Sequence, residues 1–83
     1  MKYELSNHAR RAVAERQIPI EWIERTLQAP ELIVPDTNDA TIERCFRRIP
    51  EFDGRVLRVA VNRDLEPQRV VSVFFDRKMK GKL

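Results

Sequence analysis

The hydrophobic periodicity of this chain changes once, near residue 31, and this change limits the folds that it can adopt. Before that point apolar residues recur every three or four positions, the spacing of a helix with one buried face. After it, apolar and charged residues alternate, the spacing of strands with one buried face. A chain of 83 residues has room for one small domain. The pattern therefore predicts an α+β domain of two layers over residues 1–83.

Two helices are predicted in the first part of the chain. Residues 7–16 contain neither Gly nor Pro, and Ser6 is a suitable N-cap for them. Residues 20–29 follow Pro19 and end before Pro30, so the prolines limit the second helix on both sides. The expected inward stripes are Ala9, Ala12 and Val13 on the first helix, and Ile20, Ile23 and Leu27 on the second.

The second part of the chain predicts three strands, at 41–49, 55–62 and 69–76. Their connections are too short for a crossover, so these strands should be antiparallel. Residues 69–76 carry apolar side chains on both faces, which predicts a central strand covered on both faces. Residues 1–5 and 32–35 are short candidates that would extend a sheet of three to five strands. The helices should cover one face of the sheet, and residues 77–83 should form a basic tail.

The charge distribution is uneven along the chain. Residues 1–40 carry five basic and seven acidic side chains, whereas residues 41–83 carry eleven basic and six acidic ones. Arginine outnumbers lysine twelve to four, and its planar guanidinium pairs with phosphate or carboxylate in a bidentate manner. This bias suits a surface that binds RNA or another anionic partner. It is equally consistent with arginines that pair with the chain's own thirteen carboxylates.

Several classes of protein are disfavoured by what the sequence contains. One cysteine and one histidine argue against a disulfide framework and against a structural zinc site. No apolar run approaches the length of a membrane span, and no leader segment opens the chain. We therefore expect a cytoplasmic protein without metal or cofactor. Cys45 lies among apolar neighbours and is predicted to be an unreactive core residue.

Two residues of the first helix are candidates for chemistry. His8 should lie at the rim of the inward stripe, with Arg11 and Glu15 on the same side. It would act there as a general acid or base, or else bond a neighbouring carboxylate or carbonyl at the helix start. Arg16 falls within the inward stripe, where a charge needs a partner. It would extend past the helix end to solvent, pair with a sheet carboxylate such as Asp76, or reach a substrate phosphate.

The strands contribute a third group of cationic residues. Arg44, Arg48 and Arg58 should share the open face of the sheet, because alternate residues of a strand point to the same side. Such a face, extended by cations at the end of the last strand, would bind an RNA backbone and stabilise the transition state of its cleavage. The alternative is an Arg–Glu ladder in which Glu43 and Glu51 neutralise the arginines. The full set of expected RNA contacts is Arg44, Arg48, Arg58 and Lys78.

Several motifs resemble those of a small bacterial family, the domain-of-unknown-function 4258 family. They include Ser-x-His-Ala at 6–9, Glu-Arg-x-Ile at 15–18, Glu-Trp-Ile at 21–23, Arg-Arg-Ile-Pro at 47–50 and Val-x-Val-Phe-Phe-Asp-Arg at 71–77. That family is grouped with the RelE/ParE-like and BrnT-like toxins of toxin–antitoxin systems. The resemblance implies a RelE-like fold, with a helix pair packed on an antiparallel sheet.

The resemblance also implies an activity. RelE-like toxins cut messenger RNA on the ribosome, BrnT-like toxins are ribonucleases, and both are silenced by a cognate antitoxin. By resemblance, His8, Arg16 and Arg77 would be the catalytic residues of a metal-independent ribonuclease. The chain departs from the family pattern at Ala12, where many members have an arginine. Two other functions stay open: a non-catalytic module that binds RNA or an acidic protein through the basic face, and a protein that pairs with a partner through Trp22.

Overall fold

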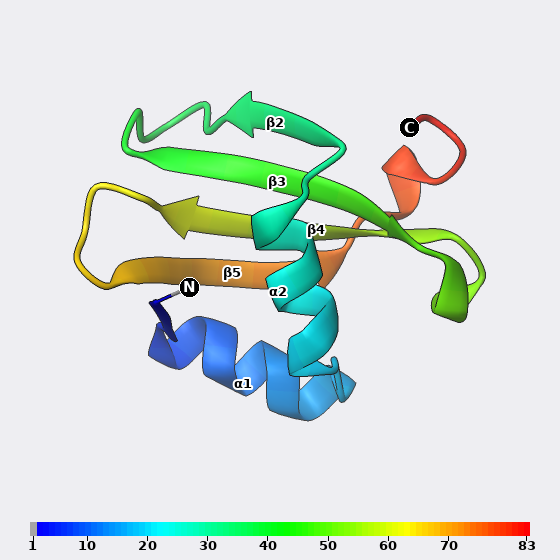
Figure 1. Ribbon diagram of the computed structural model, residues 1–83, viewed down its shortest axis with the longest axis horizontal. Coiled ribbons are helices and arrows are strands. Elements are labelled where there is room, and N and C mark those ends of the chain that lie inside the picture. The colour runs from blue at the N-terminus through cyan, green and yellow to red at the C-terminus, as the bar shows by residue number, and fades with distance from the viewer. Residues whose placement is uncertain (1) are drawn as a thin grey trace.

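The structure is a computed structural model that describes residues 2–83. It contains two α-helices and five strands, together with two short 3₁₀ helices that follow β3 and β5 (Figure 1). In chain order they are β1 (Tyr3–Leu5), α1 (Asn7–Arg16), α2 (Ile20–Gln28), β2 (Leu32–Pro35), β3 (Ile42–Ile49), η1 (Pro50–Phe52), β4 (Arg55–Asn62), β5 (Gln68–Phe75) and η2 (Arg77–Met79). Each predicted helix and strand is present within one residue of its expected bounds or as a shorter segment inside them.

The strands form one sheet in the order β1-β5-β4-β3-β2. The three pairs β2–β3, β3–β4 and β4–β5 are antiparallel, as the short hairpins predicted. β1 instead pairs with β5 in parallel, with Glu4 opposite Arg69. The predicted class, α+β with two helices on a mostly antiparallel sheet, is confirmed. β1 and β5 lie near opposite ends of the chain, so the connection between them contains β2, β3 and β4.

Both α-helices cover the same face of the sheet, and the core lies between them and the strands (Figure 1). The Ser6 hydroxyl accepts a hydrogen bond from the Ala9 N–H at 3.1 Å, which confirms the expected N-cap of α1. The apolar stripe of α2 differs from the prediction, because Ile20 is 44% exposed while Thr26 is fully buried. The buried hydroxyl of Thr26 donates to the Trp22 carbonyl at 2.8 Å, so this polar group is satisfied.

The opposite face of the sheet is more open than residues 69–76 suggested. Its β5 side chains, which include Ser72 and Phe74, are only half-buried, because both α-helices lie on the other side. The expected double coverage of this strand is therefore wrong. The apolar run in β5 instead fills the helix-covered face with Val70, Val73 and Phe75. None of the helices within residues 2–83 has the length and apolar character needed to cross a membrane.

Candidate functional site

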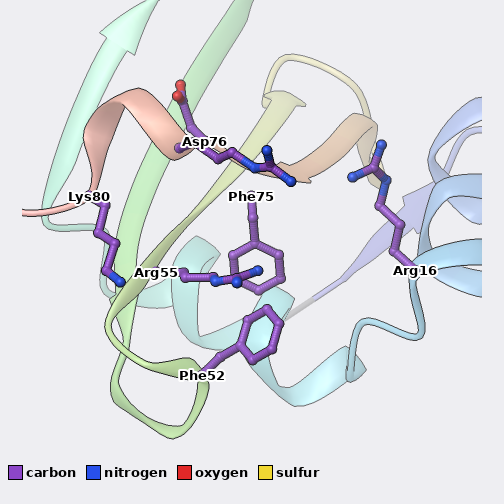
Figure 2. A pocket seen from close by; sticks show the side chains of 7 residues that line it. Arg16, Phe52, Arg55, Phe75, Asp76 and Lys80 are labelled. Carbon is purple, nitrogen blue, oxygen red and sulfur yellow. The ribbon is translucent and has the colours of Figure 1, made fainter.

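A cavity of about 440 Å³ opens at the end of the sheet where α1 ends, β4 begins and β5 gives way to η2. Four cationic side chains and two aromatic rings line it, but only one carboxylate. Figure 2 shows Arg16 on one side of Phe75, with Arg55 and Lys80 on the other side. The lining residues are Arg16, Phe52, Arg55, Phe75, Asp76, Arg77 and Lys80.

Arg16 reaches this cavity because it is the last residue of α1. Gln17 adopts the left-handed conformation (φ 53°) and turns the chain away, which leaves Arg16 exposed beyond the buried stripe. The predicted ion pair with Asp76 is not formed. The carboxylate of Asp76 lies 3.9 Å from Arg58 instead. Within residues 2–83, Arg16 has no carboxylate in ion-pair range, so its charge faces the cavity without a counter-charge.

The start of η2 fixes the other end of the cavity. The Asp76 side chain accepts a hydrogen bond from the Lys78 N–H at 3.0 Å and caps η2. This capping turn places the exposed Arg77 at the cavity wall. Lys80 also lines the cavity, and its Nζ lies 2.9 Å from Oδ2 of Asp53 in the β3–β4 connection. Arg16 and Arg77, two of the three residues that the resemblance proposed as catalytic, therefore line the same cavity.

An aromatic cluster forms the floor of the cavity. The ring centroids of Phe52 and Phe75 are 4.9 Å apart, and the Trp22 ring lies 5.8 Å and 6.1 Å from them. The guanidinium carbon of Arg55 lies 4.6 Å from the centroid of Phe52. Trp22 is partly buried against the core and packs on the two rings that face the cavity.

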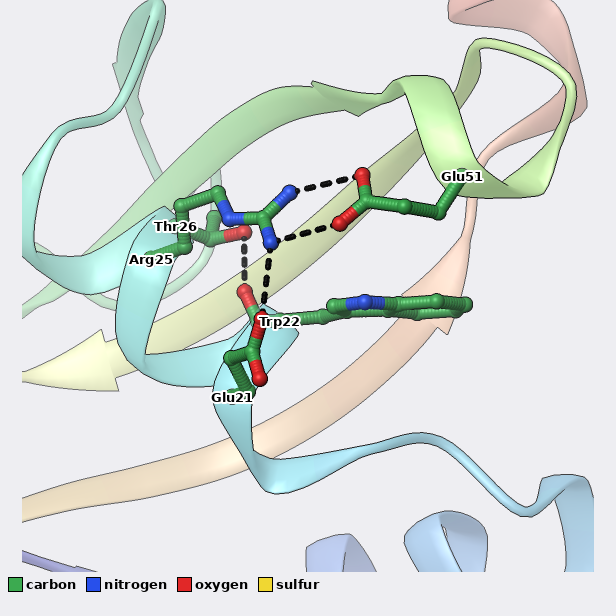
Figure 3. A network of polar contacts seen from close by, with 5 residues as sticks. All are labelled: Glu21, Trp22, Arg25, Thr26 and Glu51. Carbon is green, nitrogen blue, oxygen red and sulfur yellow. Dashed lines mark hydrogen bonds and ion pairs between the residues drawn. The ribbon is translucent and has the colours of Figure 1, made fainter.

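A network of hydrogen-bonded ion pairs connects the turn that carries this floor to α2 (Figure 3). Arg25 donates to both carboxylate oxygens of Glu51, at 2.9 and 2.7 Å, and to Glu21 at 3.0 Å. These hydrogen bonds lower the pKa of Glu51 to about 2. They also raise the pKa of Arg25 further above its usual value. Because Glu51 immediately precedes Phe52, the bidentate pair holds the aromatic floor in place.

A smaller cavity of about 230 Å³ lies between α1 and β5. His8, Arg11 and Glu15 line it, as their helical spacing predicted, and Arg16 lines both cavities. His8 is exposed, and within residues 2–83 its imidazole forms no hydrogen bond with a neighbouring carboxylate or carbonyl. The structure thus places a histidine, a glutamate and two arginines along one groove, which shares Arg16 with the larger cavity.

The predicted RNA-binding arginines do share the open face, but each lies beside a carboxylate. The distances are 2.9 Å for Arg44–Asp36, 2.7 Å for Arg48–Glu31 and 3.9 Å for Arg58–Asp76. The expected ladder partners were wrong, because Glu43 pairs with Arg63 and Glu51 with Arg25. Lys78 is exposed on η2 and does not line either cavity.

Arg58 is the most enclosed of the open-face arginines. Its guanidinium lies 4.8 Å from the Phe74 ring and 5.9 Å from the Phe46 ring, the cross-strand neighbours on either side. Its Nε is buried without a hydrogen-bond partner. Burial lowers the pKa of Arg58. This arginine therefore packs within the sheet face and presents little of its charge to solvent.

Cys45 is fully buried beneath the helices, as the sequence predicted. Burial raises the pKa of its thiol, although Arg63 Nη2 lies 3.4 Å from Sγ. Across the part of the chain that the structure describes, no group of three or more His, Cys, Asp or Glu side chains gathers in a way that could hold a metal ion. The ionisable side chains that line the cavities are those of arginine and lysine together with His8, Glu15 and Asp76.

Four cavity residues were missed by the sequence reasoning, namely Phe52, Arg55, Phe75 and Lys80. Phe52 carried the only available signal, because it is an aromatic residue in a turn that has no strand of its own in which to be buried. Arg55 opens β4 opposite Ile49, so its side chain belongs to the helix-covered face, at the open end of the sheet. The β3–β4 hairpin places Phe52 and Arg55 at the cavity, whereas Lys80 comes from the segment after η2.

The comparisons with known proteins give one match. The sequence profile described as "Domain of unknown function (DUF4258)" matches residues 5–75, from the end of β1 to the end of β5. The match includes His8, Arg16, Phe52 and Arg55, and it ends two residues before Arg77. No significant match to a curated protein or to a solved structure was found.

Proposed function

Since the chain belongs to the family described as domain of unknown function DUF4258, we propose its activity from its own site: metal-independent cleavage of RNA. The observation that carries this proposal is the cavity where Arg16, Arg55, Arg77 and Lys80 meet, three of them without an ion-pair partner within residues 2–83. Cations gathered without counter-charges form a binding site for the phosphates of a nucleic acid.

The adjoining groove supplies what the cleavage step needs. In the proposed reaction the ribose 2′-oxygen attacks phosphorus and the bond to the 5′-oxygen breaks, giving a 2′,3′-cyclic phosphate and a free 5′-hydroxyl. His8 would accept the proton of the 2′-hydroxyl and return a proton to the leaving oxygen. Arg16 lines both cavities, so it would hold the phosphate beside His8. Arg16 and Arg77 would stabilise the charge that develops on the phosphorane.

The biological role that we propose is that of a toxin in a toxin–antitoxin system. The support is the resemblance to RelE-like and BrnT-like toxins, together with a two-helix, mostly antiparallel α+β fold. A toxin of this kind would act on messenger RNA, either free or on the ribosome, and would be silenced by a cognate antitoxin protein. The competing function is a non-catalytic module that holds RNA or an acidic protein on the open sheet face.

The test is cleavage of an end-labelled single-stranded RNA by the purified protein in excess EDTA. We expect 2′,3′-cyclic phosphate ends, and a rate that falls at least tenfold in Arg16→Gln and Arg77→Gln. Arg10→Gln is the matched control, because Arg10 is also exposed on α1 but lines neither cavity. Controlled expression with a growth assay tests the toxin role. RNA binding without cleavage, on free RNA and on ribosomes, would favour the binding module.

A further inference from the structure

We infer that the larger cavity contains a nucleobase subsite, with a base stacked on Arg55 and the aromatic rings that support it. This inference rests on the proposed function in taking RNA as the ligand, and it adds which part of RNA the aromatic floor recognises. A phosphate needs cations alone. The rings of Phe52 and Phe75 line the same cavity as those cations, and phosphate recognition gives them no role.

The geometry of the platform supports stacking. The guanidinium of Arg55 lies 4.6 Å from the Phe52 centroid, so the ring positions the flat cation. Arg55 is exposed, and no carboxylate within residues 2–83 lies in ion-pair range of it. Phe52 is 38% exposed although it is a large apolar residue. Bases of unpaired RNA stack on aromatic rings and on guanidinium planes of this kind.

The platform is held in position before any ligand arrives. The bidentate pair between Arg25 and Glu51 fastens the turn that carries Phe52 to α2. The contact between Lys80 and Asp53, at 2.9 Å, ties the C-terminal segment to the same hairpin. A platform fixed from two sides loses little conformational entropy when a base stacks on it.

The cations of the cavity lie where a nucleotide would carry its phosphate. Arg16 stands across Phe75 from Arg55 and Lys80 (Figure 2), and Arg77 lines the same space. A volume of about 440 Å³ falls in the range of sites for small ligands. The cavity therefore offers a stacking surface and cationic groups within one space, which are the two requirements for holding a nucleotide.

The test compares four probes by equilibrium dialysis or calorimetry with the full chain: AMP, UMP, ribose 5-phosphate and inorganic phosphate. The two nucleotides should bind at least fivefold more tightly than ribose 5-phosphate, the low end of what a stacked base contributes. Arg55→Lys keeps the charge and removes the plane. It should abolish the preference for nucleotides over ribose 5-phosphate. Phe52→Leu should act in the same direction, and Phe52→Tyr should retain the preference.

Arg10→Lys is the control, and the melting temperature of each variant shows that it is folded. Equal affinity for AMP and ribose 5-phosphate in the wild-type protein would overturn the subsite. So would an Arg55→Lys variant that keeps the full nucleotide preference. The readout does not depend on cleavage: a nucleotide preference without RNA cleavage would leave the subsite standing and remove the proposed enzymatic function, whereas cleavage without that preference would do the reverse.

Discussion

The two arginine-rich regions of this molecule differ in how their charges are neutralised. On the open sheet face, Arg44 and Arg48 lie 2.9 and 2.7 Å from Asp36 and Glu31. In the cavity at the other side, Arg16 and Arg77 have no such partner within residues 2–83. The number of basic residues in the strands favours the open face as the anion-binding surface. The pairing of charges in the structure favours the cavity instead. Free cations, and not their density in the sequence, indicate where an anion would bind.

The difference has a simple origin in the topology. β2 lies beside β3, with Leu32 opposite Phe46 and Pro35 opposite Glu43. The carboxylates that flank β2 therefore meet the arginines of β3. The cavity cations come from the ends of elements: Arg16 ends α1 and Arg77 follows β5. Such positions have no neighbouring strand to supply a counter-charge.

The largest effect is expected from His8→Ala. If His8 moves the proton in RNA cleavage, the rate should fall by about 10²–10⁴. The affinity for RNA should change less than twofold, because the phosphates are held by the arginines. Cleavage rate and RNA affinity are measured on the same sample, with the melting temperature as a check of folding.

His8 is exposed in the first turn of α1, so the variant is expected to fold. Arg11→Ala is the matched control, because Arg11 lines the same groove and takes no part in the proposed proton transfer. Full activity of the folded His8→Ala protein would exclude His8 from catalysis. It would also leave the groove without its proposed acid–base group.

A charge-matched pair of double variants compares the two surfaces directly. In Arg16→Gln/Arg77→Gln, the log–log dependence of RNA affinity on salt should flatten by roughly 1.4, about 0.7 for each phosphate of single-stranded RNA that the variant no longer neutralises. In Arg44→Gln/Arg48→Gln the slope should stay nearly unchanged, because Asp36 and Glu31 already neutralise those arginines. Binding is measured over a salt series for each protein.

The reverse result would restore the open face as the RNA-binding surface. That surface, formed by Arg44, Arg48, Arg58 and Lys78, stays a prediction of the sequence until this comparison is made. Equal flattening in both double variants would mean that RNA wraps from one side of the sheet to the other.

Much of the fold was predictable because most elements have a local signal in the sequence. Ser6 begins α1, the prolines limit α2, and alternation fixes the faces of β3 and β4. The parallel pairing of β1 was not predictable, because it depends on a contact between opposite ends of the chain. The same holds for the exposed Ile20, since the packing angle of α2 decides which side of its stripe is buried.

The candidate site was predictable only in part. His8, Arg16 and Arg77 were identified, but the partner of Arg16 was not. The sequence suggested Asp76, whereas the pleat of β5 directs that carboxylate toward Arg58. The floor formed by Phe52 and Arg55 was missed because it depends on the turn between two strands. Charge partners are set by register and by turns, and hydrophobic periodicity carries little information on either.

Substitutions on the open sheet face and in the cavity should also differ in their effect on the free energy of unfolding. Asp76→Ala removes the cap of η2 and the nearest carboxylate to the half-buried Arg58. It should lower the free energy of unfolding by about 1–2 kcal/mol. Arg58→Met should leave that free energy unchanged or raise it by about 1 kcal/mol, because the apolar side chain fits between Phe46 and Phe74. Denaturant unfolding measures both changes.

Arg16→Gln is the reference for this experiment, because an exposed arginine without a partner should contribute almost nothing to stability. If Arg58→Met proves strongly destabilising, the charge of Arg58 is required in the folded protein. The open face would then hold an arginine whose role goes beyond packing.

The smallest effect concerns the ion pair that supports the aromatic floor. The hydrogen bonds from Arg25 lower the pKa of Glu51 from 4.5 to about 2. A carboxyl whose pKa is lower in the folded protein stabilises the fold at pH values above its unfolded pKa, and this contribution is lost as the pH falls. The loss should therefore extend from about pH 4.5 down to about pH 2.

An NMR titration of the Glu51 carboxyl carbon should give a midpoint near 2, and in Arg25→Gln the midpoint should return toward 4.5. The carboxyl carbon of Glu31, whose pKa is lowered by Arg48 instead of Arg25, provides the internal control, because its midpoint should not respond to the Arg25 substitution. An unshifted Glu51 in the wild-type protein would mean that the turn is not held by Arg25, and that Phe52 is free to leave the cavity floor.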